Sequence, residues 1–133
     1  MAGTTPVPEP VHGGPSAPPG GPAALESANL ALAFALELVA LWAVARWGWG
    51  VGSSTATRVA LAIGAAGLWA AVWGLLFSPR ATVRLSAQVK ESGQWLMFAV
   101  AVLALQATVS RTAALVLAGL VVVNRVLIRR WHQ

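Results

Sequence analysis

Two ionisable side chains stand inside long apolar stretches of the sequence, and they are the first candidates for chemistry. Glu37 lies at the centre of the first stretch, and Arg125 lies near the end of the last one. An acid in the middle of a membrane helix costs about 2.5–3.5 kcal/mol, which is most of the roughly 4 kcal/mol that the apolar residues around Glu37 contribute. Glu37 is therefore expected to face protein or a wet cavity. The long guanidinium arm of Arg125 can reach it there.

The pair of Glu37 and Arg125 has two main interpretations. In the structural one, the two side chains fix how the first and last helices dock. In the functional one, Glu37 is a proton or cation site of a small coupled transporter. A third, plainer reading is a protonated acid without a role. Arg125 favours the structural interpretation, because an acid neutralised by a fixed guanidinium is a poor exchanger of protons and cations.

Three amides inside the apolar stretches are expected to support this pair. Asn29, Gln106 and Asn124 can each form hydrogen bonds between helices, which contribute about 0.6 kcal/mol each on average. Helical spacing also gives the first helix one face that is expected to turn towards protein. Its members are Asn29, Ala33, Glu37, Ala40 and Val44.

The remaining polar residues argue against an enzyme. The chain has no Cys, which excludes disulfides, zinc–thiolate sites and cysteine nucleophiles. His12 lies in the Pro-rich tail and His132 is the penultimate residue, and we expect neither to have a carboxylate or thiol partner for metal binding or acid–base chemistry. No nucleophile, base and orienting group can be assembled. We therefore expect no catalytic residues, no metal site and no cofactor. The net charge of +5 comes without a nucleic-acid motif, so we expect no nucleic-acid partner.

The elements that must position these residues follow from the composition. Of the 133 residues, 57% are apolar and 10% are charged, against roughly 45–50% and 25% in a soluble domain. The sequence predicts an all-α fold, an integral membrane four-helix bundle over residues 28–131, because each apolar stretch matches the ~30 Å hydrocarbon core of a bilayer. Residues 1–27 hold seven of the eight Pro and are expected to form a disordered tail. The four predicted helices cover about 28–46, 58–77, 91–109 and 112–130.

The second stretch carries small residues at a regular spacing. The intervals 4-3-4-3 line them along one side of a helix, which predicts a close-packing face against a neighbouring helix or a second copy of the chain. Trp69 and Trp73 project from the opposite side, as lipid contacts or core. The small residues are Ala60, Gly64, Gly67, Ala71 and Gly74.

The basic residues predict the orientation. With four crossings, six of them fall on the side of both termini, and Arg46, Arg58 and Arg111 fall on the other. This imbalance favours termini in the cytoplasm, for a protein of the bacterial cytoplasmic membrane. The expected partners are the lipid bilayer and either a second copy, in a homo-oligomer, or another membrane protein.

The order of several short motifs resembles the YrdB-like family of small bacterial membrane proteins. The resemblance covers about Ser27 to Trp131 and implies a four-helix integral membrane domain of unknown function, without any reaction. It also marks Trp73, Pro79 and Glu91 as positions to examine, beside those named above. The motifs are Asn29-Leu30-Ala31-Leu32, Leu36-Glu37-Leu38, Trp73-Gly74, Ser78-Pro79-Arg80-Ala81, Glu91 and Val123-Asn124-Arg125. We therefore expect a structural or interaction role, with the Glu37 transporter as the alternative.

Overall fold

The computed structural model describes residues 2–5, 7–8, 13–14 and 22–131. Residues 1, 6, 9–12 and 15–21 of the predicted disordered tail, which include His12, lie outside these residues, as does His132. The described chain is all-helical and contains no strand, which confirms the predicted fold class at this level. The helices are α1 (Pro22–Val51), α2 (Thr55–Val72) with a π-helical continuation (Trp73–Phe77), α3 (Ala87–Thr108) and α4 (Arg111–Arg130).

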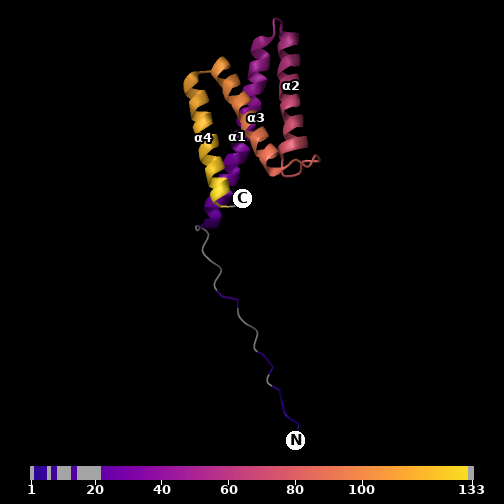
Figure 1. Ribbon diagram of the computed structural model, residues 1–133, viewed down its shortest axis with the longest axis vertical. Helices are drawn as coiled ribbons and strands as arrows, with labels where there is room; N and C mark the ends of the chain where they lie inside the picture. The colour runs from indigo at the N-terminus through magenta and orange to yellow at the C-terminus, as the bar shows by residue number, and fades with distance from the viewer. Residues whose placement is uncertain (1, 6, 9–12, 15–21, 132–133) are drawn as a thin grey trace.

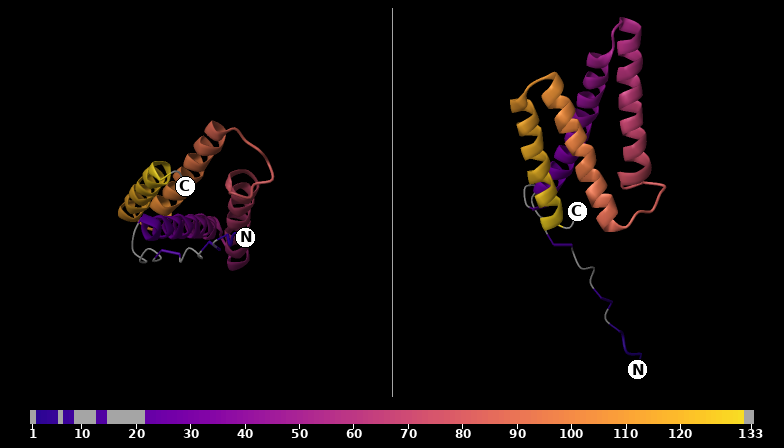
Figure 2. Two further views of the ribbon diagram at one scale, coloured as in Figure 1. Left: turned by 90° about the horizontal axis from the view of Figure 1, so that it is seen from below. Right: turned by 45° about the horizontal axis from the view of Figure 1, so that its top comes forward.

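The helices run alternately up and down (Figure 1). The start of α1, the loop between Phe77 and Ala87 and the end of α4 lie at one end of the molecule, and the two short turns lie at the other. α1 is the central helix, since it packs against α2, α3 and α4. α3 packs against α4, whereas α2 leans away from α3 (Figure 2).

α1 is longer at both ends than the sequence predicts. It begins at Pro22 instead of residue 28, because proline suits the first turn of a helix and the following Ala23, Ala24 and Leu25 are strong helix formers. It continues through Gly48 and Gly50 to Val51, where a break was expected. A glycine inside a helix costs only about 1 kcal/mol, which packing against α2 offsets.

Serine residues begin the other three helices. The hydroxyls of Ser54, Ser86 and Ser110 accept hydrogen bonds from backbone N–H groups in the first turns of α2, α3 and α4. At Ser54 the cap is reciprocal, because Thr57 also accepts from the Ser54 backbone. Ser110 thus closes the tight turn between α3 and α4, where the sequence predicts one.

Small residues pack at the centre and large apolar residues cover the outside. Ala40 and Ala43 of α1 and Ala101 of α3 are fully buried, which lets these two helices approach closely. Ile63 and Leu103, by contrast, are 69% and 65% exposed, and large apolar side chains are exposed on all four helices. A water-soluble protein rarely exposes such a continuous apolar surface.

Three helices are long and apolar enough to cross a membrane: α1, α2 with its π-helical continuation, and α4. The sequence predicts four crossings, and α3 is the one that falls short. Its 22 residues give it a length of about 33 Å. Its first two turns, however, contain Lys90, Glu91, Ser92 and Gln94, which lower the hydropathy of the whole segment.

Candidate functional site

Polar side chains from all four helices gather in the half of the molecule that holds the start of α1 and the end of α4. We call Glu37, Trp73, Gln94 and Arg125 the polar cluster. They come from α1, the π-helical segment, α3 and α4 respectively. Trp73 is buried and the other three side chains are half-buried. The cluster is thus a meeting point of four elements that lie far apart in the sequence.

Arg125 makes its hydrogen bond to α3. Its Nη1 donates to Oε1 of Gln94 at 2.7 Å, and its guanidinium carbon lies 5.5 Å from the centre of the Phe98 ring. Gln94 in turn donates from Nε2 to the carbonyl oxygen of Phe77 at 2.9 Å. Phe77 is the last residue of the π-helical segment, and a carbonyl in the last turn of a helix has no backbone N–H of that helix to accept from. One side chain of α3 therefore connects the end of the second helix to α4.

Glu37 lies beside the same group. Its carboxylate accepts a hydrogen bond from the Trp73 side chain, and it lies within electrostatic range of Arg125 but not within the 4.0 Å of an ion pair. The predicted pair thus consists of electrostatic neighbours whose hydrogen bonds go to Trp73 and Gln94. Among residues 22–131 the ion pair within 4.0 Å is a different one, between Arg129 of α4 and Glu91 of α3.

A second polar contact joins α1 to α4 in the core. Nδ2 of Asn124 donates to both the backbone carbonyl and the side-chain oxygen of Asn29, each at 2.9 Å. The two asparagines are 3% and 4% exposed. Both were expected to bond between helices, and the structure shows that they bond to each other.

Replacing Asn124 with leucine is expected to lower the free energy of unfolding by about 1 kcal/mol, because two buried interhelical hydrogen bonds are lost. Asn124→Asp should cost more, since a carboxylate would face two oxygen acceptors of Asn29 in an apolar setting. Thermal unfolding in detergent measures both. Gln106→Leu is the control for exchanging an amide for leucine, and it should leave the stability nearly unchanged. A loss at Gln106 as large as that at Asn124 would contradict the assignment.

Gln106 is the predicted polar contact that does not form. Its side chain is exposed, and within residues 22–131 it has no hydrogen bond. It stands two residues before the end of α3 at Thr108, where the amide can reach the polar end of the molecule. The expectation that it joins two helices is therefore wrong in this structure.

The aromatic face of α2 is core. Trp69 and Trp73 stack with centroids 5.5 Å apart and planes 5° apart, and Trp73 meets Phe98 of α3 edge-on at 5.6 Å. Such contacts contribute about 0.5–1.5 kcal/mol each beyond the burial of area. Of the two readings that the sequence left open for these tryptophans, lipid contact or core, the structure shows the second.

The small-residue face of α2 turns outward. All five of its residues are exposed, and a Cβ added at Gly64, Gly67 or Gly74 would meet no neighbour within 4 Å. Within the described residues, this face does not pack against a helix of the same chain. The side of the helix that packs inward is instead the one that carries Trp69, Trp73 and Phe77. Pro79 also lies exposed, in the loop that follows the π-helical segment.

Gln94 is the member of the polar cluster that sequence reasoning missed. It lies near the polar start of α3, where an amide is unremarkable. The signal that could have found it is its spacing from Phe98, Ala101 and Leu105, which places it on the buried face of α3. Within the residues that the structure describes, no three His, Cys, Asp or Glu side chains gather in a way that could hold a metal ion.

The fold and the cluster together define a class: an all-helical protein whose helices are compatible with a membrane and whose polar side chains meet inside. The chain belongs to the family described as Protein of unknown function (DUF2568), whose model matches residues 31–122. The match includes Glu37, Trp73 and Gln94 and ends just before Asn124 and Arg125. The family description assigns no function, and the match does not confirm the YrdB resemblance. The comparisons with curated proteins and with solved structures gave no match.

Proposed function

We propose that this protein is an integral component of the bacterial cytoplasmic membrane that crosses it four times and has a structural or interaction role. The observation that carries the proposal is the inverted distribution of side chains. Large apolar residues cover the outside of all four helices, while the polar cluster and the Asn29–Asn124 contact lie between helices. Lipid is the solvent that favours this arrangement, because an intramembrane polar group must find its partners inside the protein.

α3 is the fourth crossing in this proposal, although it is less apolar than the others. It is long enough at about 33 Å, and it runs antiparallel to α2 and α4, the helices before and after it in the chain. Two of the residues that lower its hydropathy are paired within the protein. Gln94 bonds to Phe77 and Arg125, and Lys90 donates from Nζ to the carbonyl oxygen of Ser78 at 3.2 Å.

The proposed orientation places both termini in the cytoplasm. The end of the molecule that holds the start of α1, the loop over residues 78–86 and the basic end of α4 also carries Arg80, Arg84 and Lys90. The opposite end carries fewer basic residues, of which Arg58 and Arg111 lie beside the turns. Basic residues stay on the cytoplasmic side during insertion, so the richer end is the cytoplasmic one.

Reporter fusions in bacterial cells are expected to confirm this topology. A phosphatase that is active only in the periplasm should be inactive after Arg130 and within the Ser78–Ser86 loop, and active when inserted at Ser53 or Ser110. A cytoplasm-active fluorescent reporter should give the opposite pattern. Opposite signals from the Ser78–Ser86 loop and the C-terminus would overturn the four crossings, and periplasmic signals from both would reverse the orientation.

The role proposed for the polar cluster is to hold the four helices in register. Glu37→Gln is therefore expected to lower the thermal stability of the purified protein. Proton flux into reconstituted vesicles should stay at background for the unchanged protein and for the variant. The alternative is the small proton- or cation-coupled transporter that uses Glu37. Full stability of Glu37→Gln, together with the loss of a substrate-driven proton flux that the unchanged protein shows, would establish that alternative.

The proposed interaction partners are the bilayer itself and a second membrane helix. The small-residue face of α2 lies outside the packed helices, where a helix of another copy or of another membrane protein can approach closely. Cross-linking through cysteines placed at Gly67 tests this: a homodimeric product in membranes supports a homo-oligomer, and a monomer at all protein densities argues against it.

A further inference from the structure

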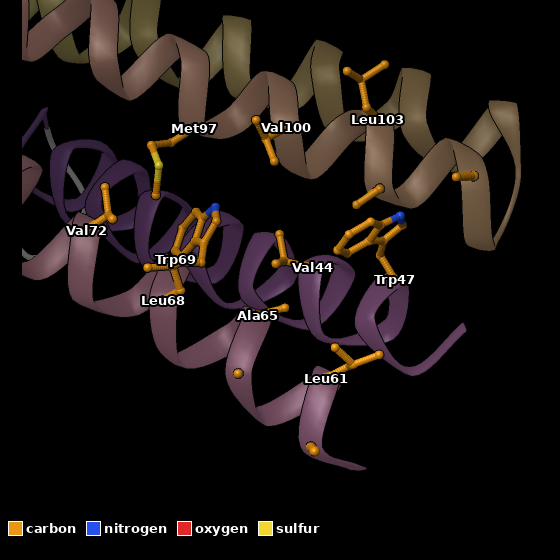
Figure 3. A pocket seen from close by; sticks show the side chains of 14 residues that line it. Val44, Trp47, Leu61, Ala65, Leu68, Trp69, Val72, Met97, Val100 and Leu103 are labelled. Carbon is orange, nitrogen blue, oxygen red and sulfur yellow. The ribbon is translucent and has the colours of Figure 1, made fainter. Parts of the chain in front are cut away.

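An apolar groove lies between α2 and α3, with α1 as its floor (Figure 3). α2 and α3 each pack against α1 and have little contact with one another, so the groove opens towards the outside. Its volume of about 770 Å³ lies within the roughly 300–1,000 Å³ of small-molecule sites. Its walls include Val44, Trp47, Leu68, Trp69, Met97 and Leu103.

One side chain of this wall carries a hydrogen-bond donor that lacks a partner. Trp69 is 7% exposed, and within the described residues its indole Nε1 is buried without a hydrogen bond. Figure 3 shows the nitrogen edge of the ring turned towards the groove. An unpaired buried donor costs about 1–3 kcal/mol, so nearly all such groups in proteins have partners. A single donor in an apolar wall is the usual means of orienting an apolar ligand.

The depth of Trp69 restricts the ligand. It stands eight residues before the end of the second helix at Phe77, about 12 Å along the axis, and fourteen residues after Thr55. If α2 crosses the bilayer as proposed above, this donor lies well inside the hydrocarbon. The ester oxygens of a phospholipid stay near the polar boundary, because its charged headgroup holds them there. The acceptor must therefore belong to a neutral lipophilic molecule.

The aromatic lining suits a flat ring. The indoles of Trp47 and Trp69 both line the groove, and aromatic faces pack well against planar conjugated rings. Met97 lines the same groove, and its flexible thioether side chain can move to admit a ligand to the buried donor. We propose that the groove binds a neutral lipophilic quinone, a planar ring with an apolar tail, whose carbonyl oxygen accepts the hydrogen bond of Trp69 Nε1.

The test is a titration of the full-length protein in detergent micelles with decyl-1,4-benzoquinone, followed by the indole ¹H–¹⁵N resonances. The signal of Trp69, identified by its loss in Trp69→Phe, should shift and saturate. Trp69→Phe removes the donor and keeps a ring, so the dissociation constant should rise about three- to tenfold. Decylbenzene, which lacks the carbonyl oxygens, should bind more weakly than the quinone and leave the Trp69 resonance nearly in place.

Two glycines of α2 supply a matched pair of variants that does not disturb the core. Gly64 lines the groove and Gly67 does not, yet both are exposed and have free space around a new Cβ. Gly64→Leu should fill the groove and abolish saturable binding. Gly67→Leu, the same change three residues further on, should bind like the unchanged protein.

Equal binding by the two leucine variants would overturn the proposal. Equal affinity for decylbenzene and the quinone would also overturn it, because the groove would then bind hydrocarbon chains without regard to the carbonyl oxygen. Tighter binding of a short-chain diacylglycerol than of the quinone would overturn it as well. These outcomes are independent of the membrane topology, because the titration needs no bilayer. The reporter fusions can therefore succeed while this proposal fails, and the reverse.

Discussion

Replacing Gly48 with alanine is expected to destabilise the protein more than any other single-methyl change in α1. Gly48 is buried in the last turns of this helix, where α1 meets the start of α2. A Cβ at this position would lie 2.7 Å from the carbonyl carbon of Leu61 and 3.0 Å from the amide nitrogen of Ala62, and its closest contact would be the carbonyl oxygen of Leu61. All three atoms belong to the backbone, so a change of side-chain rotamer cannot make room.

The two helices would have to separate, and we expect a loss of about 1–3 kcal/mol or more in the free energy of unfolding. Thermal unfolding in detergent measures it as a fall of several degrees in the midpoint. Gly48→Val should be worse than Gly48→Ala, because each added methyl group increases the overlap.

Gly50 supplies the control for this prediction. It lies two residues further along α1, is exposed, and offers free space for a Cβ. Gly50→Ala should therefore stabilise the helix by about 0.5–1 kcal/mol, which is the intrinsic gain of alanine over glycine. Opposite signs for two identical changes on one helix would establish the close approach of α1 and α2. Equal effects of the two alanines would contradict it.

The polar residues within the apolar helices predicted which face of α1 packs against the other helices. The face of α1 predicted from Asn29 and Glu37 is the face that packs, with Ala40 and Val44 buried along it. The reason is physical: a polar group in a bilayer must turn towards protein, so it marks the inner side of its helix. Gln106 shows where this rule ends, because near a helix terminus an amide can reach polar surroundings without a protein partner.

The orientation of α2 could not be predicted, because nearly all of its residues are apolar. A helix in lipid has no polar outer face to contrast with its inner face, and the small residues and the tryptophans of α2 were both candidates for packing. The structure buries Trp69 and Trp73 and exposes Gly64 and Gly67. The side that packs is decided by contacts with other helices, such as that of Trp73 with Phe98 of α3. No pattern within α2 contains that information.

Arg125→Gln is expected to have the second large effect. Arg125 contacts α3 through Gln94 and Phe98 and lies beside the charge of Glu37 from α1. Breaking a fully buried charge pair costs about 3–5 kcal/mol, because the remaining charge loses its compensation. Both side chains are half-buried here, so we expect a loss of about 2 kcal/mol, with Glu37→Gln costing a similar amount. Unfolding in detergent, followed by circular dichroism, measures each variant.

The double variant separates a coupled pair from two independent contacts. If the charges of Glu37 and Arg125 act on each other, the first substitution already leaves the other charge without its partner, and the second then costs little more. We expect a coupling of about 1–2 kcal/mol in the cycle of single and double variants. Arg129→Gln, one turn further along α4, is the control: its ion pair with Glu91 is exposed, and such pairs contribute about 0–1 kcal/mol. Additive losses at Glu37 and Arg125 would show that Gln94 and Trp73 hold the two side chains independently, and that the charges do not join α1 to α4.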